Sequence, residues 1–102
     1  MARLVTLKST VKPANLVILA AACNSAAEMG ISITVTSGND SQHMAGSRHF
    51  SNEALDFRSK DMDKVTYTLF IDKMRARLGS RYQVIHESIG RTNQHIHVEL
   101  DA

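Results

Sequence analysis

The apolar positions of the chain follow two periods, one helical and one of alternating strand type. A helix is predicted over about 13–29, which is rich in Ala and Leu, carries Pro13 in its first turn and ends at Gly30. Residues 31–36 alternate strictly between aliphatic and hydroxyl side chains, as a half-buried strand does. The side chains of this strand that we expect in the core are Ile31, Ile33 and Val35.

The middle of the chain lacks regular apolar spacing and then regains it. Residues 37–53 are polar and irregular, and a loop of this length in a small domain is usually functional or disordered. A short strand is predicted over 54–58, followed by a helix over about 61–78, with Asp61 or Asp63 at its N-terminus. The expected apolar face of this helix consists of Met62, Val65, Leu69, Phe70, Ile71, Met74 and Leu78.

Two further strands are predicted near the C-terminus, at about 81–87 and 94–100, joined by a connection short enough for a hairpin. These elements indicate an α+β fold, in which two helices pack on a small, mainly antiparallel sheet. With 102 residues, 43% of them hydrophobic, the chain is expected to form a single domain spanning 1–102.

Charge and cysteine content narrow the function classes. The formal charge of +2 and the lack of any run of like charges give little support to nucleic-acid binding, so no nucleic-acid partner is expected. The pI of about 8.9 would not repel an acidic polymer such as the bacterial cell wall. A lone cysteine, Cys23, excludes both an intramolecular disulfide and a closed zinc site built from thiolates.

The apolar run 14–23 raises the question of a membrane segment or signal peptide. It is too short to span a bilayer, and Asn15 and Asn24 interrupt it. Without this helix, the rest of the chain would be too small to keep a stable core. We therefore expect no membrane partner and no signal peptide, with synthesis in the cytoplasm.

Histidines and a carboxylate form the most informative pattern. His49 and Asp56 are seven residues apart, and His95 and His97 flank one residue of the last strand. Together they offer enough donors for a zinc ion with three protein ligands and an open position for water, as catalysis requires. On the last strand, His95, His97 and Glu99 share the face opposite to Ile96, Val98 and Leu100. Taken singly, each histidine is more often a surface or hydrogen-bonded residue than a ligand.

The same residues carry a resemblance to a family. The segment from Ser47 to Asp56 resembles the Ser-x-His-x-x-Gly-x-Ala-x-Asp motif of the zinc D-Ala-D-Ala carboxypeptidases. Relatives of these enzymes include phage L-alanyl-D-glutamate endopeptidases and the hedgehog signalling domains. The ending Gln94-His95-Ile96-His97-Val98-Glu99 resembles the last zinc-ligand segment of the family, and Ser37-Gly38 resembles its Ser-Gly-Tyr-Arg turn. The resemblance covers about residues 31–100.

The resemblance implies a role for each matching residue. His49, Asp56 and His97 would be zinc ligands, and His95 would handle protons on the zinc-bound water or stabilise the transition state. Such a site would hydrolyse amide bonds in peptidoglycan stem peptides. Further residues expected to line the cleft or contact substrate are His43, Arg48 and Gln94.

Three positions depart from the family pattern. Asn52 replaces the glycine of the first motif, and Gln94 stands where relatives with Glu-x-x-His carry a carboxylate base. The turn continues as Asn39-Asp40, without the family's arginine, which polarises the substrate carbonyl. The residues that could substitute for this arginine are His43, Arg48 and Arg58.

The leading hypothesis is a phage or prophage type zinc peptidase that acts on the cell wall after release or as part of a virion or larger lytic assembly. The alternative is a catalytically inactive, zinc-stabilised virion, tail or assembly module of the same fold. A third reading is a small α+β domain that binds nucleic acid or protein without metal.

Overall fold

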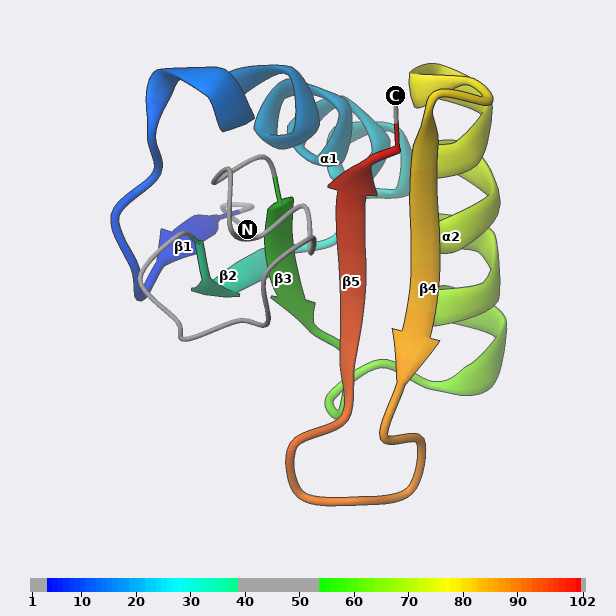
Figure 1. Ribbon diagram of the computed structural model, residues 1–102. Helices are drawn as coiled ribbons and strands as arrows, with labels where there is room; N and C mark the ends of the chain where they lie inside the picture. Colours follow the sequence, from blue (N-terminus) through cyan, green and yellow to red (C-terminus); the bar gives the residue numbers. More distant parts are fainter. Residues whose placement is uncertain (1–3, 39–53, 102) are drawn as a thin grey trace.

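The computed structural model describes residues 4–38 and 54–101, which form a five-stranded sheet with two helices packed on it (Figure 1). The order of the strands across the sheet is β1-β2-β3-β5-β4. The pair β1–β2 is parallel and the other three pairs are antiparallel. The predicted α+β class is therefore confirmed, with a mixed but mostly antiparallel sheet. The strands are β1 (Val5–Leu7), β2 (Ile33–Ser37), β3 (Ala54–Arg58), β4 (Tyr82–Glu87) and β5 (His95–Leu100).

The first helical segment begins and ends where the sequence predicts. A 3-10 turn, η1 (Pro13–Asn15), leads into α1 (Leu16–Met29). Gly30 follows with φ of 71°, and its N–H donates to the carbonyl oxygens of Ala26 and Ala27. Glycine adopts this left-handed backbone without the steric cost that a Cβ would add.

The second helix, α2 (Lys64–Leu78), starts at a side-chain cap. Of the two candidate carboxylates, Asp63 provides the cap, accepting a hydrogen bond of 2.8 Å from the Thr66 N–H. This bond satisfies one of the free N–H groups of the first turn and lowers the pKa of Asp63.

The predicted apolar face of α2 was wrong at two positions. Val65 and Leu69, four residues apart on one side of the helix, are 77% and 45% exposed. Of the predicted face, the helix buries Phe70, Ile71 and Met74. The helix carries apolar residues on more than one side, so its sequence alone does not determine which of them are buried. Packing against the sheet determines it.

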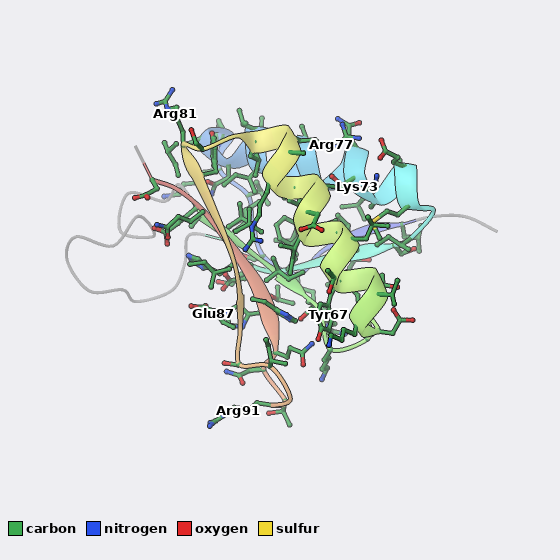
Figure 2. All side chains as sticks on the ribbon, turned by 90° about the vertical axis from the view of Figure 1, so that its right-hand side faces the viewer. Tyr67, Lys73, Arg77, Arg81, Glu87 and Arg91 are labelled. Atoms are coloured by element: carbon green, nitrogen blue, oxygen red, sulfur yellow. The ribbon has the colours of Figure 1, made fainter. Side chains whose placement is uncertain are left out.

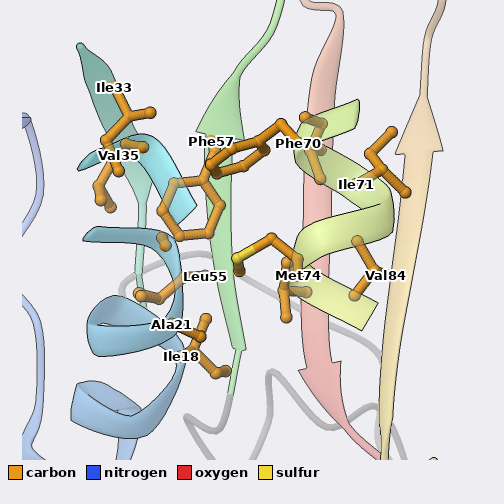
Figure 3. Packing of buried hydrophobic residues seen from close by; sticks show 14 residues of the cluster. Ile18, Ala21, Ile33, Val35, Leu55, Phe57, Phe70, Ile71, Met74 and Val84 are labelled. Carbon is orange, nitrogen blue, oxygen red and sulfur yellow. The ribbon is translucent and has the colours of Figure 1, made fainter. Parts of the chain in front are cut away.

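The core lies between the two helices and one face of the sheet (Figure 3). Phe57 of β3 meets Phe70 of α2 edge to face, with ring centroids 6.1 Å apart. The alternation predicted for β2 and β5 places Ile33, Val35, Ile96 and Val98 in this cluster. His97 is also buried, although it lies on the other face, and β4 buries only Val84. The strand residues in the core are Ile33, Val35, Leu55, Phe57, Val84, Ile96 and Val98. Ile31 precedes β2 and is partly buried against the core. The intervening side chains consequently belong to the opposite face of the sheet.

Strand β1 was not predicted. Its three residues are all exposed and show no alternation of buried and exposed positions. It lies at the edge of the sheet, paired with β2. Just beyond its end, the Lys8 N–H donates a further hydrogen bond to the Val35 carbonyl oxygen of β2. Among the described residues, no helix has the length and apolar character needed to cross a membrane.

Candidate functional site

The face of the sheet opposite to the helices is polar at its centre, and the strand register brings its titratable side chains together. Asp56 of β3 lies directly opposite His97 of β5, and Arg58 lies opposite His95. On the other side of β5, His95 pairs with Glu87 of β4. The sequence predicts His95 and His97 on one face of their strand, and the register adds which residues of β3 and β4 are their neighbours.

His97 is the centre of a buried hydrogen-bonded group. Its ring bonds Asp56 Oδ1 through Nδ1 at 2.8 Å and Glu99 Oε1 through Nε2 at 2.6 Å. Only 7% of the residue is exposed. Because a carboxylate only accepts hydrogen bonds, a ring with a carboxylate on each nitrogen donates through both N–H groups and carries a positive charge.

The pKa of His97 reflects this arrangement. Burial of the ring lowers the pKa, but the hydrogen bonds to Asp56 and Glu99 and the charges of Asp56 and Glu87 outweigh it. The net effect raises the pKa of His97 from the usual 6.5 to about 9. In this state His97 keeps its second proton at neutral pH.

His95 is held on the same face by different partners. Its Nδ1 lies 2.7 Å from the Asn93 carbonyl oxygen, and its Nε2 lies 2.9 Å from Glu87 Oε1. Glu87 projects from the lower half of β4, close to the hairpin (Figure 2). These contacts fix the ring plane of His95 between its own loop and the neighbouring strand.

A pocket of about 260 Å³ opens beside this group, at the end of β3 and the start of β5. Its lining includes three of the predicted site residues, Asp56, Gln94 and His95. It also includes two basic residues, Arg58 and Lys60. The candidate ligand Asp56 and the candidate proton-transfer residue His95 thus border a cavity that a ligand could enter.

Gln94 is tied into the loop by both ends of its amide. Its Oε1 accepts from the Gly90 N–H at 2.8 Å, and its Nε2 donates to the Ser59 carbonyl oxygen and hydroxyl at 3.2 and 3.1 Å. Ser59 is fully buried and also bonds His86 Nε2 at 2.8 Å. Burial and the nearby His95 lower the pKa of His86, so this ring favours its neutral form. Gln94 therefore fixes the hairpin loop against β3 and contributes to the pocket wall.

Several predicted residues lie outside the described part of the chain. These are His43, Arg48 and His49, so the proposed third zinc ligand has no described position. The turn that resembles the family's Ser-Gly-Tyr-Arg segment is described up to Gly38. Its Ser37 pairs with Asp56 across β2 and β3, which places the turn next to the candidate ligand.

Close packing explains the glycine of this turn. A Cβ added to Gly38 would lie 2.5 Å from the Thr10 carbonyl oxygen. Any side chain would force the two backbone segments apart. Gly38 thus allows the N-terminal segment to lie against the end of β2.

The described residues contain two of the three expected zinc ligands. Within 4–38 and 54–101, no group of three or more His, Cys, Asp or Glu side chains is arranged to hold a metal ion. Asp56 and Glu99 bind opposite nitrogens of His97, so these three side chains do not converge on one point. The pair that does converge is Asp56 Oδ1 and His97 Nδ1.

The partners of the histidines were the part of the site that sequence reasoning undervalued. The sequence places Glu99 on the same strand face as the two histidines, but by itself it does not distinguish Glu87 or Glu99 from ordinary surface carboxylates. The signal that could have found Glu99 is the pattern His-x-His-x-Glu on one strand, which puts a carboxylate beside the second imidazole. Glu87 required the register between β4 and β5.

Fold and site together define a small α+β domain with a histidine and carboxylate cluster on the face of the sheet opposite to its two helices. No family model matches the sequence, and no curated protein matches it with significant similarity. The resemblance to zinc peptidases accordingly remains a prediction from the motifs.

Proposed function

We propose that this protein is a zinc-dependent peptidase that hydrolyses amide bonds in peptidoglycan stem peptides. The observation that carries the proposal is the position of Asp56 and His97. These two motif residues are 41 positions apart in the sequence, yet Asp56 Oδ1 and His97 Nδ1, the atoms that would bind the metal, lie 2.8 Å apart. The motif carried by residues 47–56 supplies His49 as the third ligand.

The donor set fits zinc. Oxygen and nitrogen ligands at about 2.0–2.1 Å from a tetrahedral cation are roughly 3.3 Å apart. The present separation of 2.8 Å holds a proton between the two atoms, so zinc would have to replace that proton and the two atoms would have to move apart. Glu99 supports the assignment, because a carboxylate on the far nitrogen of a ligand histidine fixes its tautomer and raises its basicity.

His95 is the residue we assign to proton transfer. When bound, zinc would polarise the scissile carbonyl and activate water for attack on it. His95 lines the same pocket as Asp56 and lies two positions before His97 on β5. An imidazole can both accept and donate a proton, which suits delivery of a proton to the leaving amine.

Glu87 would position His95 rather than contact substrate. It lies 2.9 Å from the ring Nε2, while the Asn93 carbonyl oxygen accepts from Nδ1. To contact substrate, the ring exchanges one of these acceptors for the reacting group. Such bonds commonly rearrange when a substrate binds.

The test is a comparison of two histidine variants. We expect His97→Ala to lose both bound zinc and hydrolysis of purified peptidoglycan, because a ligand is removed. His95→Ala is expected to keep zinc and to lose rate, by about 10²–10⁴-fold for a residue that transfers protons. Metal content by atomic emission and released peptides by mass spectrometry give the two readouts.

His86→Gln is the matched control, since His86 lies on the same hairpin but pairs with Ile96 on the core side. It should keep zinc and activity. Full activity of metal-free protein on cell walls would refute the proposal.

A second candidate function is a zinc-stabilised assembly module without catalysis, for example in a virion. The observation that favours it is the turn after β2, where Asn39-Asp40 replaces the family's arginine. This candidate predicts one zinc per chain, a large stability loss with chelator and no hydrolysis of any muropeptide.

A further inference from the structure

The pocket beside the candidate zinc ligands has an uneven distribution of charge. Asp56 and His95 form the side that belongs to the proposed metal site. Arg58 and Lys60 continue from the end of β3 and form a basic side. Arg58 lies two positions after Asp56, so both side chains project from the same face of the strand.

The two basic side chains are available to a ligand. Within the described part of the chain, neither Arg58 nor Lys60 forms a side-chain hydrogen bond or ion pair. The neighbouring acceptors are already engaged, since Glu87 binds His95 and Asp56 binds His97. Arg58 is partly buried, whereas Lys60 is exposed.

This combination suits an anionic group. A guanidinium presents its donors in a flat fork that matches a carboxylate, and partial burial strengthens the attraction. A surface cation without a function would more commonly point into solvent than line a cavity next to reactive side chains. The size of the cavity, 260 Å³, lies near the lower end of small-molecule sites, which span roughly 300–1,000 Å³. The cavity therefore fits one end group and not a whole muropeptide.

We infer that Arg58, assisted by Lys60, binds a substrate carboxylate that lies next to the amide to be cleaved. This inference rests on the proposed function, because it names a feature of that function's substrate. Arg58 is also one of the three residues that the sequence offers in place of the family's turn arginine, and the other two, His43 and Arg48, lie outside the described residues. The strand register sets Arg58 beside the candidate metal and proton-transfer residues.

The experiment uses two ligands that differ only in the anionic group. N-acetyl-D-alanyl-D-alanine carries a free carboxylate, and its C-terminal carboxamide has the same shape without the charge. Each is titrated into zinc-loaded protein and followed by two-dimensional NMR, which yields Kd and the amides that shift. We expect the carboxylate ligand to bind at least tenfold more tightly and to shift pocket amides such as Thr36 and Asn93.

Four variants locate the anion site. Arg58→Gln should lose most of the preference for the carboxylate, a change of about 10- to 100-fold, as expected for a charge-assisted hydrogen bond. Arg58→Lys should recover part of it, because the charge remains but the fork is lost. Lys60→Gln should cost only a few-fold, because its ammonium is exposed. Arg81→Gln removes the same charge at the opposite end of β4 and should change nothing (Figure 2).

The outcomes separate this inference from the function on which it rests. Equal affinity for both ligands, or binding of neither, overturns the inference. A preference that survives in Arg58→Gln also overturns it, because the metal or another group would then hold the carboxylate. Hydrolysis of stem peptides at the same rate by Arg58→Gln and native protein would leave the peptidase proposal intact and remove Arg58 from it. An Arg58-dependent preference without any hydrolysis would retain the anion site and refute the peptidase.

Discussion

At the scale of single residues, His97 holds the site together. Its two ring nitrogens bind carboxylates from two strands, Asp56 on β3 and Glu99 on β5 itself. A buried imidazolium between two carboxylates satisfies its charge without metal. Under the proposed function, the same three side chains would form a metal ligand pair with a supporting carboxylate once zinc replaced the proton on Nδ1.

This arrangement predicts a pH dependence for the metal-free protein. The pKa of His97 is raised by folding from 6.5 to about 9, so the folded state holds its proton more tightly than the unfolded chain. The stabilisation is therefore complete below pH 6.5 and is lost as pH rises toward 9. The shift corresponds to an effect on the order of 3 kcal/mol. Urea unfolding followed by circular dichroism between pH 6 and 9.5, with chelator present, measures it.

The control for this pH series is His97→Gln, which removes the titrating ring and retains a polar side chain. Its unfolding free energy should vary less with pH over the same range. Parallel pH profiles for the two proteins would show that the proton on His97 does not stabilise the fold.

At the scale of elements, the end of β2 depends on Gly38. We expect Gly38→Ala to destabilise the protein by about 1–3 kcal/mol, because its Cβ would lie 2.5 Å from the Thr10 carbonyl oxygen. Gly90→Asn is a contrasting glycine replacement, since the space around Gly90 is open and Asn tolerates its positive φ. Denaturant midpoints of the two variants test the difference. Equal losses would mean that the N-terminal segment moves away at little cost.

Helix α2 provides a direct test of the face that packing selected. Phe70→Ala should cost about 3–5 kcal/mol, because it empties a fully buried position beside Phe57. Val65→Ala should stay within about 0.5 kcal/mol, since Val65 is 77% exposed. Thermal unfolding of both variants shows whether Val65 belongs to the packed face, as first predicted, or to the exposed side, with Phe70 as the buried reference. A large loss at Val65 would favour the packed face.

Helix packing also depends on charges that the helical pattern did not predict. Glu28 near the end of α1 forms ion pairs with Lys73 and Arg77 of α2. The hydrogen bond and positive charge of Lys73 lower the pKa of Glu28. These pairs join the two helices on the side away from the sheet.

At the scale of the whole molecule, zinc should act as a stabilising ligand. It would connect β3, β5 and the segment that carries His49, and a ligand at 100 times its Kd stabilises the folded state by about 2.7 kcal/mol. We expect a rise in Tm of more than about 10 °C with zinc, reversed by chelator, for a chain of this length. His97→Ala should show no rise. An unchanged Tm of the native protein in excess zinc would contradict the proposed metal site.

The sequence by itself determined the local elements and which strand face each side chain occupies. Pro13 and Gly30 set the limits of the first helix, and alternation in 95–100 assigned the histidines and Glu99 to one face. These features follow from backbone sterics and from a side-chain period of two, both of which are local properties.

Only the tertiary structure decided which of these side chains meet. The pairing of β3 with β5 places Asp56 beside His97, and the pairing of β4 with β5 places Glu87 beside His95. The same register places Arg58 in the pocket wall. Packing of α2 on the sheet buries Phe70 and leaves Leu69 exposed. Contacts between strands depend on register and on which hydrophobic surface is buried most effectively. Both are properties of the assembled sheet, and short-range sequence patterns do not encode them.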